Sequence, residues 1–329
     1  MRRREFLGTA IGAAVIGSGA VSRALSAATL GVSPAPAAAG ALSMAAGADA
    51  TGIKPMAVGL LIQPSHGPEA TIARVKEMGF SNCFLSLDDY IGKFTPELAK
   101  QIKDLLDKYQ VVATTVEVVG PGRLVWNFTD GPATIGVVPR ESRAARIDAL
   151  KQASDFAKLV GIPQVQTHCG FIPENPRDPL YEETVMAIRE LAMHCAGNGQ
   201  NFLMETGQET PTTLSRAIKD VNQPNLGVGL DTANLILYGK ANPVDAVDII
   251  GPHVKSIHAK DGKWPTDPMN LGEEVLIGQG LVDFKAVFTK LKKIGYTGAV
   301  TIERETSGPQ QIEDVKNEKI YLEKILEQI

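Results

Sequence analysis

Four residues in the second half of the chain are of the types that hold divalent cations, and each lies at the end of a short hydrophobic run. The runs are NFLMET with Glu205, LGVGLD with Asp231, VKSIH with His258 and AVTIE with Glu303. Three carboxylates and one imidazole suit a hard or borderline ion such as Mn²⁺, Mg²⁺ or Zn²⁺. Taken singly, each has an ordinary explanation, because a strand-end Asp often caps the next helix. The set of four is therefore more informative than any one member.

These residues need a fold that brings the ends of successive strands together. Strand-like and helix-like segments alternate eight times along the body of the chain. The expected strands are 56–63, 82–87, 111–119, 164–169, 201–206, 226–231, 254–260 and 299–304. The expected helices are 69–78, 96–108, 140–159, 180–195, 212–220, 244–250, 284–294 and 310–328. This alternation predicts an α/β fold, a closed (β/α)8 TIM barrel, rather than an open doubly wound sheet, since no GxGxxG follows the first strand.

In such a barrel the carboxyl ends of the strands surround one axis, and active sites lie at that face. Glu205, Asp231, His258 and Glu303 would then point into one small volume. Three carboxylates there would repel one another strongly without a cation. We therefore expect one divalent metal ion as the cofactor.

The N-terminal region differs in composition from the rest of the chain. Residues 1–28 fit a twin-arginine signal peptide, with RREFL at 3–7, an apolar Gly/Ala-rich stretch and small residues suited to cleavage. The stretch is shorter than the ~20 apolar residues of a membrane span, so we expect a removed signal, with an uncleaved anchor as the alternative. We expect residues 29–52 to form a flexible leader and residues 53–329 to form one catalytic domain. The expected location is periplasmic or secreted, without a stable membrane anchor.

Composition excludes some classes of partner and of fold. The chain has 329 residues, a formal net charge of -4 and an isoelectric point near 5.8. This acidic balance argues against nucleic acid as a partner. Three cysteines, Cys83, Cys169 and Cys195, are too few for a disulfide framework.

Several segments resemble a known family. They are METGQE (204–209), LDTANLILYG (230–239), IHAKDG (257–262), LGEEVLIGQGLVDF (271–284) and GYTGAVTIERE (295–305). Together they are similar to the sugar phosphate isomerase/epimerase family, whose members are xylose isomerase-like α/β barrels. The resemblance covers essentially the whole body of the chain, and it implies a sugar or keto-sugar substrate.

The resemblance also implies roles for the four residues. Glu205, Asp231, His258 and Glu303 would be the metal ligands, with Mn²⁺ as the expected ion and Mg²⁺, Co²⁺ or Zn²⁺ as alternatives. Ketose epimerases of the family use their two metal-bound glutamates as the acid/base pair, which assigns Glu205 and Glu303 as catalytic residues. A cation that bridges the carbonyl and hydroxyl oxygens of a sugar stabilises an enediolate, so one carboxylate can remove a proton and the other can return it.

Three positions depart from the family pattern. Asn234 stands where many relatives have His, and Lys260, together with Asp261 and Lys263, occupies the neighbourhood beyond His258 where epimerases often have Arg. Glu209 is the nearest counterpart of a family Glu with different spacing. We assign all three to substrate binding, with a pair between Lys260 and Asp261 as an equal alternative. These differences argue against a standard ketohexose pocket and leave the metal ligands in place.

Four further residues are expected at the mouth of the barrel. His168 and Glu117 lie at the ends of the fourth and third predicted strands, His66 follows the first, and Trp126 lies in the loop after the third. We expect His168 to contact substrate or to assist proton transfer, with a structural, hydrogen-bonded His as the alternative. Trp126 would stack on a sugar ring, with a hydrophobic lid or an interface contact as the alternative.

These features predict a metal-dependent sugar isomerase or epimerase whose substrate is a small sugar, keto-sugar or glycoside. Export favours an unphosphorylated substrate, because sugar phosphates are mainly cytoplasmic.

The same machinery could catalyse β-elimination, so a lyase acting on 3-keto-glycosides is the alternative. A non-catalytic sugar-binding protein is less favoured because both glutamates are present. A metal-dependent endonuclease would need more than the five histidines found here and a basic groove. A homo-oligomer is a further expectation from the resemblance.

Overall fold

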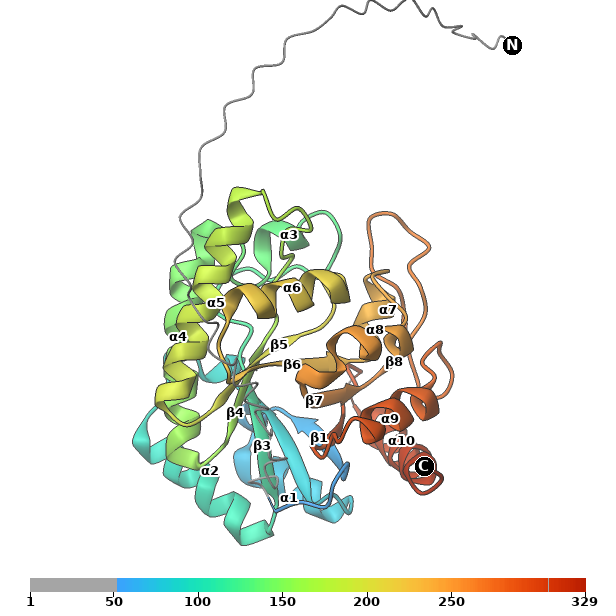
Figure 1. Cartoon of the computed structure of the whole chain (residues 1–329). Coiled ribbons are helices and arrows are strands. Elements are labelled where there is room, and N and C mark those ends of the chain that lie inside the picture. Colours follow the sequence, from blue (N-terminus) through green and yellow to red (C-terminus); the bar gives the residue numbers. More distant parts are fainter. Residues whose placement is uncertain (1–51, 307) are drawn as a thin grey trace, which may run out of the picture. The chain divides into compact units, whose positions relative to one another are not determined.

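The computed structural model describes residues 52–306 and 308–329, so the predicted signal peptide and nearly all of the predicted leader lie outside the described residues. Within these residues eight parallel strands close into a barrel, in the order β1-β10-β7-β6-β5-β4-β3-β2. The helices lie on the outside of the strands (Figure 1). This architecture confirms the predicted (β/α)8 TIM barrel.

Every barrel strand and outer helix corresponds to a segment predicted from the sequence. The strands are β1 Val58–Ile62, β2 Asn82–Ser86, β3 Val112–Glu117, β4 Gln164–Thr167, β5 Asn201–Glu205, β6 Leu226–Asp231, β7 Val254–Ala259 and β10 Val300–Ile302. The outer helices are α1 Pro68–Glu77, α2 Pro96–Tyr109, α4 Arg140–Val160, α5 Pro179–Gly197, α6 Pro211–Val221, α8 Pro243–Ile250, α9 Phe284–Lys293 and α10 Pro309–Leu326.

Local capping residues set many of the helix boundaries. α2 begins after Thr95, whose hydroxyl accepts a hydrogen bond from the backbone N–H of Leu98. The side chain of Asp283 accepts from the backbone N–H of Ala286 at the start of α9. α4 ends at Gly161, whose φ of 94° is a left-handed conformation that glycine adopts without steric cost. These signals are local in sequence, which is why the boundaries could be predicted closely.

The structure adds short elements that periodicity does not predict, because they span too few residues. They are α3 Gly131–Thr134, α7 Asn234–Leu237, the hairpin of β8 Asp261–Gly262 with β9 Glu274–Val275, and the 3-10 helices η1 Pro64–His66, η2 Asp88–Tyr90 and η3 Gly251–His253. The Asp261 carboxylate holds the loop that contains the hairpin. It accepts hydrogen bonds from the backbone N–H groups of Gly262, Gly278, Gly280 and Val282.

The register of the strands aligns the predicted ligand positions. Asp231 on β6 lies opposite His258 on β7, and Thr301 on β10 lies opposite His258 on the other side. Just past β10, the backbone N–H of Glu303 donates to the carbonyl oxygen of Ala259 and continues this alignment. Parallel pairing therefore brings side chains that are distant in sequence to one end of the barrel.

The space between strands and helices is filled by buried apolar side chains, among them Phe156, Phe202 and Phe288. All three cysteines are buried and unpaired, which agrees with the expected lack of a disulfide framework. Over residues 52–306 and 308–329, none of the helices combines the length and the apolar character that crossing a membrane would require.

Candidate metal centre and active site

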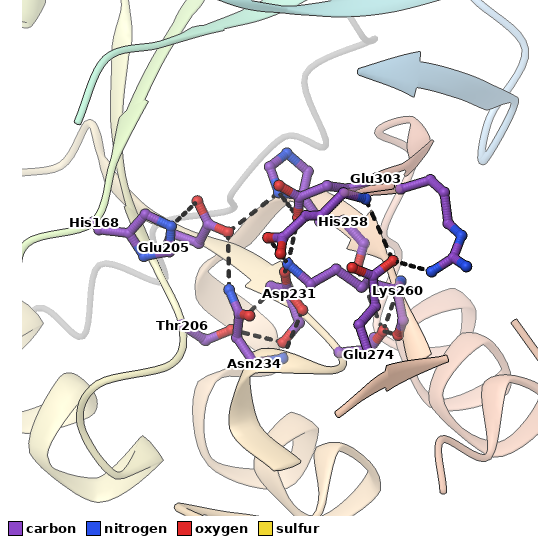
Figure 2. A network of polar contacts seen from close by, with 12 residues as sticks. His168, Glu205, Thr206, Asp231, Asn234, His258, Lys260, Glu274 and Glu303 are labelled. Carbon is purple, nitrogen blue, oxygen red and sulfur yellow. Dashed lines mark hydrogen bonds and ion pairs between the residues drawn. The ribbon is translucent and has the colours of Figure 1, made fainter. Parts of the chain in front are cut away.

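Four side chains meet at the carboxyl ends of β5, β6, β7 and β10. They belong to Glu205, Asp231, His258 and Glu303, and their ligand-type atoms all lie within 4.8 Å of one another. Figure 2 shows Glu205, Asp231, His258 and Glu303 gathered in one polar network. We call these four residues the metal cluster. The structure thus brings together the whole ligand set that the sequence predicts.

The metal cluster is almost closed to solvent. The side chains of Glu205, Asp231 and His258 are at most 1% exposed, and that of Glu303 is 15% exposed. His258 Nδ1 lies 3.2 Å from Glu205 Oε1 and 3.3 Å from Glu303 Oε2. Burial raises the pKa of Asp231 even though the nearby charge of Lys260 opposes this change.

The donor set fits a divalent cation. His258 Nε2 is buried and has no hydrogen-bond partner among the described residues. The buried Asp231 Oδ2 accepts no hydrogen bond among these residues either, and the Lys260 ammonium lies 3.3 Å from it as an ion-pair partner. Unsatisfied buried polar atoms are costly, so such atoms commonly mark the place of an ion or water. Three carboxylates with one imidazole are also a common ligand set for Mn²⁺, Mg²⁺ or Zn²⁺. The residues present therefore match the expected cofactor.

Lys260 places a buried positive charge against the metal cluster. Its Nζ lies 3.3 Å from Asp231 Oδ2, 3.1 Å from Glu303 Oε2 and 2.7 Å from Glu305 Oε1, and its side chain is 2% exposed. Burial lowers the pKa of the Lys260 ammonium, but the three carboxylates outweigh burial and raise it well above its usual value. The suggested pair with Asp261 is wrong, because the Asp261 carboxylate is occupied by backbone N–H groups.

Three side chains orient Glu205. Gln166 Nε2 donates to Glu205 Oε2 at 3.0 Å, and Asn234 Nδ2 lies 3.3 Å from Glu205 Oε1. His168 Nε2 lies 3.3 Å from Glu205 Oε2. Burial alone would raise the pKa of the Glu205 carboxyl, but the charges of His168 and His258 lower it to about 2. Figure 2 shows His168 and Asn234 directed toward the Glu205 carboxylate from two sides.

Sequence reasoning missed Gln166. Its Oε1 accepts a hydrogen bond from the hydroxyl of Ser256 at 2.5 Å. A Cβ added at Gly229 would lie 2.0 Å from Gln166 Oε1, so only glycine leaves room for this side chain. Gly229 itself was the available signal in the sequence. A glycine inside a strand such as β6 often marks a place where another group approaches the backbone closely.

A second group adjoins the metal cluster at Glu205. The ligand-type atoms of Glu117, His168 and Glu205 lie within 4.8 Å of one another. His168 Nδ1 also lies 3.1 Å from the amide nitrogen of Gln208, a further residue that sequence reasoning missed. Burial and the nearby charge of Glu205 raise the pKa of Glu117 well above its usual value. His168 and Glu117 therefore lie at the site, as predicted from their strand ends.

The remaining predicted residues lie outside these two groups. The ring of Trp126 is 4.9 Å from that of His168, centroid to centroid, and this residue is 42% exposed. His66 is exposed, lies 3.7 Å from Asp89, and lines a cavity that also includes Glu303. Glu209 is buried, its Oε2 has no hydrogen-bond partner among the described residues, and burial raises its pKa to about 8. A role in substrate binding stays a prediction for all three.

The fold and the metal cluster define the class of protein: a (β/α)8 barrel with a candidate metal centre at the carboxyl ends of its strands. Residues 72–325 match the xylose isomerase-like TIM barrel family, and the chain belongs to that family. The resemblance seen in the sequence is thereby confirmed at the level of the family.

Individual relatives place the chain near sugar epimerases. The crystal structure of a xylose isomerase domain protein from Planctomyces limnophilus is 33% identical, with a TM-score of 0.79 over 84% of this chain and 99% of that one. L-ribulose-5-phosphate 3-epimerase UlaE of Shigella boydii is 28% identical over 192 residues, which are 53% of this chain and 62% of that relative. The chain thus spans less than two thirds of this epimerase. The fold is also shared with 3-keto-D-glucoside 4-epimerase YcjR from E. coli, at 15% identity and a TM-score of 0.61 over 82% of this chain and 99% of that one.

Proposed function

We propose that this protein is a divalent-metal-dependent sugar isomerase or epimerase that removes a proton from the carbon next to a carbonyl group. The observation that carries the proposal is the buried metal cluster, whose ligand-type atoms lie within 4.8 Å of one another at the catalytic end of the barrel. An epimerase among the sequence relatives supports a sugar as the substrate. Mn²⁺ is the expected ion, with Mg²⁺, Co²⁺ or Zn²⁺ as alternatives.

The four residues of the metal cluster would hold the ion. A divalent ion held there would polarise the carbonyl and hydroxyl oxygens of a sugar, which lowers the energy of an enediolate. Gln166, Asn234 and His168 orient the Glu205 carboxylate, so this group would keep its direction during proton transfer.

Two carboxylates can move the proton. Glu205 ends β5 and Glu303 follows β10, and these strands are not neighbours in the barrel. The two groups can therefore approach a substrate carbon from different directions. If one removes the proton and the other returns it to the opposite face, the configuration of that carbon is inverted. Lys260 lies between Asp231 and Glu303 and can donate a hydrogen bond to a substrate oxygen.

Cleavage of 3-keto-glycosides is a second candidate function at the same site. Loss of the C2 proton to a carboxylate can be followed by formation of a C1–C2 double bond and breakage of the C1–O bond. The aglycone then leaves with the bonding electron pair and takes up a proton. A cavity of about 420 Å³ beside Glu303 favours this reading, because it offers room beyond a single sugar ring.

Deuterium exchange tests the proposal. The mature protein, loaded with Mn²⁺, is incubated in D₂O with ketohexoses and separately with 3-keto-glycosides. Deuterium uptake with inversion at C2 or C3 is the expected result for an epimerase, whereas release of the aglycone identifies a lyase. Fully metallated protein that binds sugars and exchanges no proton would be a sugar-binding protein instead, and the proposal would be wrong.

A further inference from the structure

A cavity of about 420 Å³ opens between the first and the last helix of the barrel. Small-molecule sites typically have volumes of ~300–1,000 Å³, so this cavity is large enough for a ligand group. It runs from Glu303 along the facing sides of α1 and α10. The eight outer helices form a ring, and α1 and α10 contact each other less than any other neighbouring pair in it.

Glu303 connects this cavity with the metal cluster. It is the one member of the metal cluster that lines the cavity, and it is also the member with a partly exposed side chain, at 15%. Glu305 lines the cavity beside it and accepts a hydrogen bond from Lys260 Nζ at 2.7 Å. The inner end of the cavity therefore presents two carboxylates, which are good acceptors for sugar hydroxyl groups.

Apolar side chains line much of the rest of the cavity, among them Leu61 of β1 and Ile312 of α10. Each outer helix of a βα unit starts at the catalytic end of the barrel, so residues late in α1 lie farther from the site than early ones. Thr71 and Gln311 line the part near the helix starts. Val75 and Arg74 of α1, Met78 just past the end of α1, and Val315 of α10 line the deeper part. A ligand that fills this space would meet acidic residues next to the metal cluster and apolar side chains along much of the remaining wall.

We propose that this cavity binds the aglycone of a glycoside whose sugar ring lies at the metal cluster. The inference rests on the proposed function, because it needs a sugar at Glu303. A free ketohexose carries hydroxyl groups along its whole length and would match poorly the apolar surface that Leu61, Met78 and Ile312 leave partly exposed in the cavity. An apolar, aromatic aglycone would cover these side chains, and its ring could stack on the planar guanidinium of Arg74. The substrate class is therefore an aryl or alkyl keto-glycoside.

Binding of unreactive glycosides tests the inference without relying on turnover. The full chain, loaded with Mn²⁺, is titrated by calorimetry with phenyl β-D-glucopyranoside and with methyl β-D-glucopyranoside. We expect the phenyl glycoside to bind roughly tenfold tighter or better, since hydrophobic pockets discriminate by about this factor per small apolar group. Equal affinities of the two glycosides would overturn the inference.

Two variants locate the preference in the cavity. Ala70→Trp on α1 and Gln311→Trp on α10 each fill the cavity from one side, and each should bring the two dissociation constants close together. Lys76→Trp is the matched control, because Lys76 is exposed on α1 and does not line the cavity; it should keep the preference. Melting temperatures confirm that the variants fold. A preference that survives both filling variants would overturn the inference.

The two proposals fail in different ways. If ketoses and keto-glycosides exchange no proton but the phenyl preference is present and sensitive to Ala70→Trp, the reaction is wrong and the aglycone site stands. If ketoses exchange protons but the two glycosides bind equally, the reaction stands and the aglycone site is wrong.

Discussion

At the scale of single residues, the side chains around Glu205 matter as much as the ligands themselves. Gln166 sits between the hydroxyl of Ser256 and the carboxylate of Glu205, in space that Gly229 leaves free. One oxygen of Glu205 is therefore directed toward Gln166, while the other faces His258 at 3.2 Å. Such hydrogen bonds fix the orientation of a metal ligand and raise the affinity for the ion.

Replacing Gln166 by leucine should weaken metal binding. The variant Gln166→Leu removes the hydrogen bond to Glu205 and leaves the ligands unchanged, so the affinity for Mn²⁺ should fall by about 10–100-fold. Isothermal titration calorimetry measures the change. Gln164→Leu is the control, because Gln164 lies on the same strand but its amide group is directed at the backbone of Lys255. Equal Mn²⁺ affinities for the Gln166 variant and the unaltered protein would show that Gln166 does not orient Glu205 for metal binding.

The carboxylate of Glu303 is expected to be essential for turnover. Glu303→Gln keeps the shape of the side chain but cannot take up a proton, so the rate of deuterium exchange should fall at least about 100-fold. Circular dichroism should show a fold close to that of the unaltered protein. Retained exchange would refute the acid/base role of Glu303.

At the scale of elements, one helix and one loop together support the end of β10. Arg304, next to Glu303, forms ion pairs with Glu274 of β9 and with Asp314 and Glu318 of α10. Glu318 Oε1 also accepts a hydrogen bond from the backbone N–H of Ile277, in the loop after β9. α10 and the β8–β9 hairpin are thus tied together directly behind the candidate acid/base group.

This arrangement predicts how stability changes with pH. Burial raises the pKa of Glu318 from 4.5 to about 7, against the opposing effects of the Ile277 hydrogen bond and the Arg304 charge. Because the folded-state pKa is the higher one, the stabilising contribution of protonation is complete below pH 4.5 and is lost as the pH rises through 7. At about 1.4 kcal/mol per pKa unit, the loss amounts to at most ~3 kcal/mol in the free energy of unfolding.

Glu318→Gln should abolish this part of the pH dependence. Between pH 5 and pH 8, roughly the span set by these pKa values, the variant should gain stability relative to the unaltered protein. Urea denaturation at several pH values measures the difference. Glu313→Gln, an exposed position on the same helix, is the control and should leave the profile unchanged. Parallel profiles for the Glu318 variant and the unaltered protein would contradict the prediction.

At the scale of the whole molecule, the predicted export signal would decide where the protein meets the proposed substrate. The segment RREFL at 3–7 lies outside the described residues, so this remains an expectation from the sequence. The twin-arginine route exports folded proteins, so the metal could be bound in the cytoplasm first. A periplasmic or secreted location would also give access to unphosphorylated glycosides.

A paired substitution tests the export signal. Arg3→Lys together with Arg4→Lys keeps the charge but removes the guanidinium pair, and the folded protein should then accumulate in the cytoplasm. Cell fractionation in the native host measures the distribution. Arg2→Lys alone is the control and should not change it. Normal export of the double variant would exclude the twin-arginine route.

The barrel and the four residues of the metal cluster could be predicted from the order of amino acids alone. Alternating strand and helix patterns, capping residues such as Thr95 and Asp283, and a ligand-type residue at each of four strand ends are all readable along the chain. They are readable because periodicity and capping depend on neighbours within a few positions. The parallel barrel then follows from the number and order of the elements.

The contacts among the remaining groups become visible in the folded protein and could not be predicted beforehand. The ion pairs of Lys260 with Glu303 and Glu305, the hydrogen bond from Gln166 to Glu205, and the cavity between α1 and α10 all join residues far apart in the chain. Their meeting depends on strand register, on the space left by Gly229 and on how closely two terminal helices pack. Packing in three dimensions sets these quantities, and no short stretch of sequence encodes them.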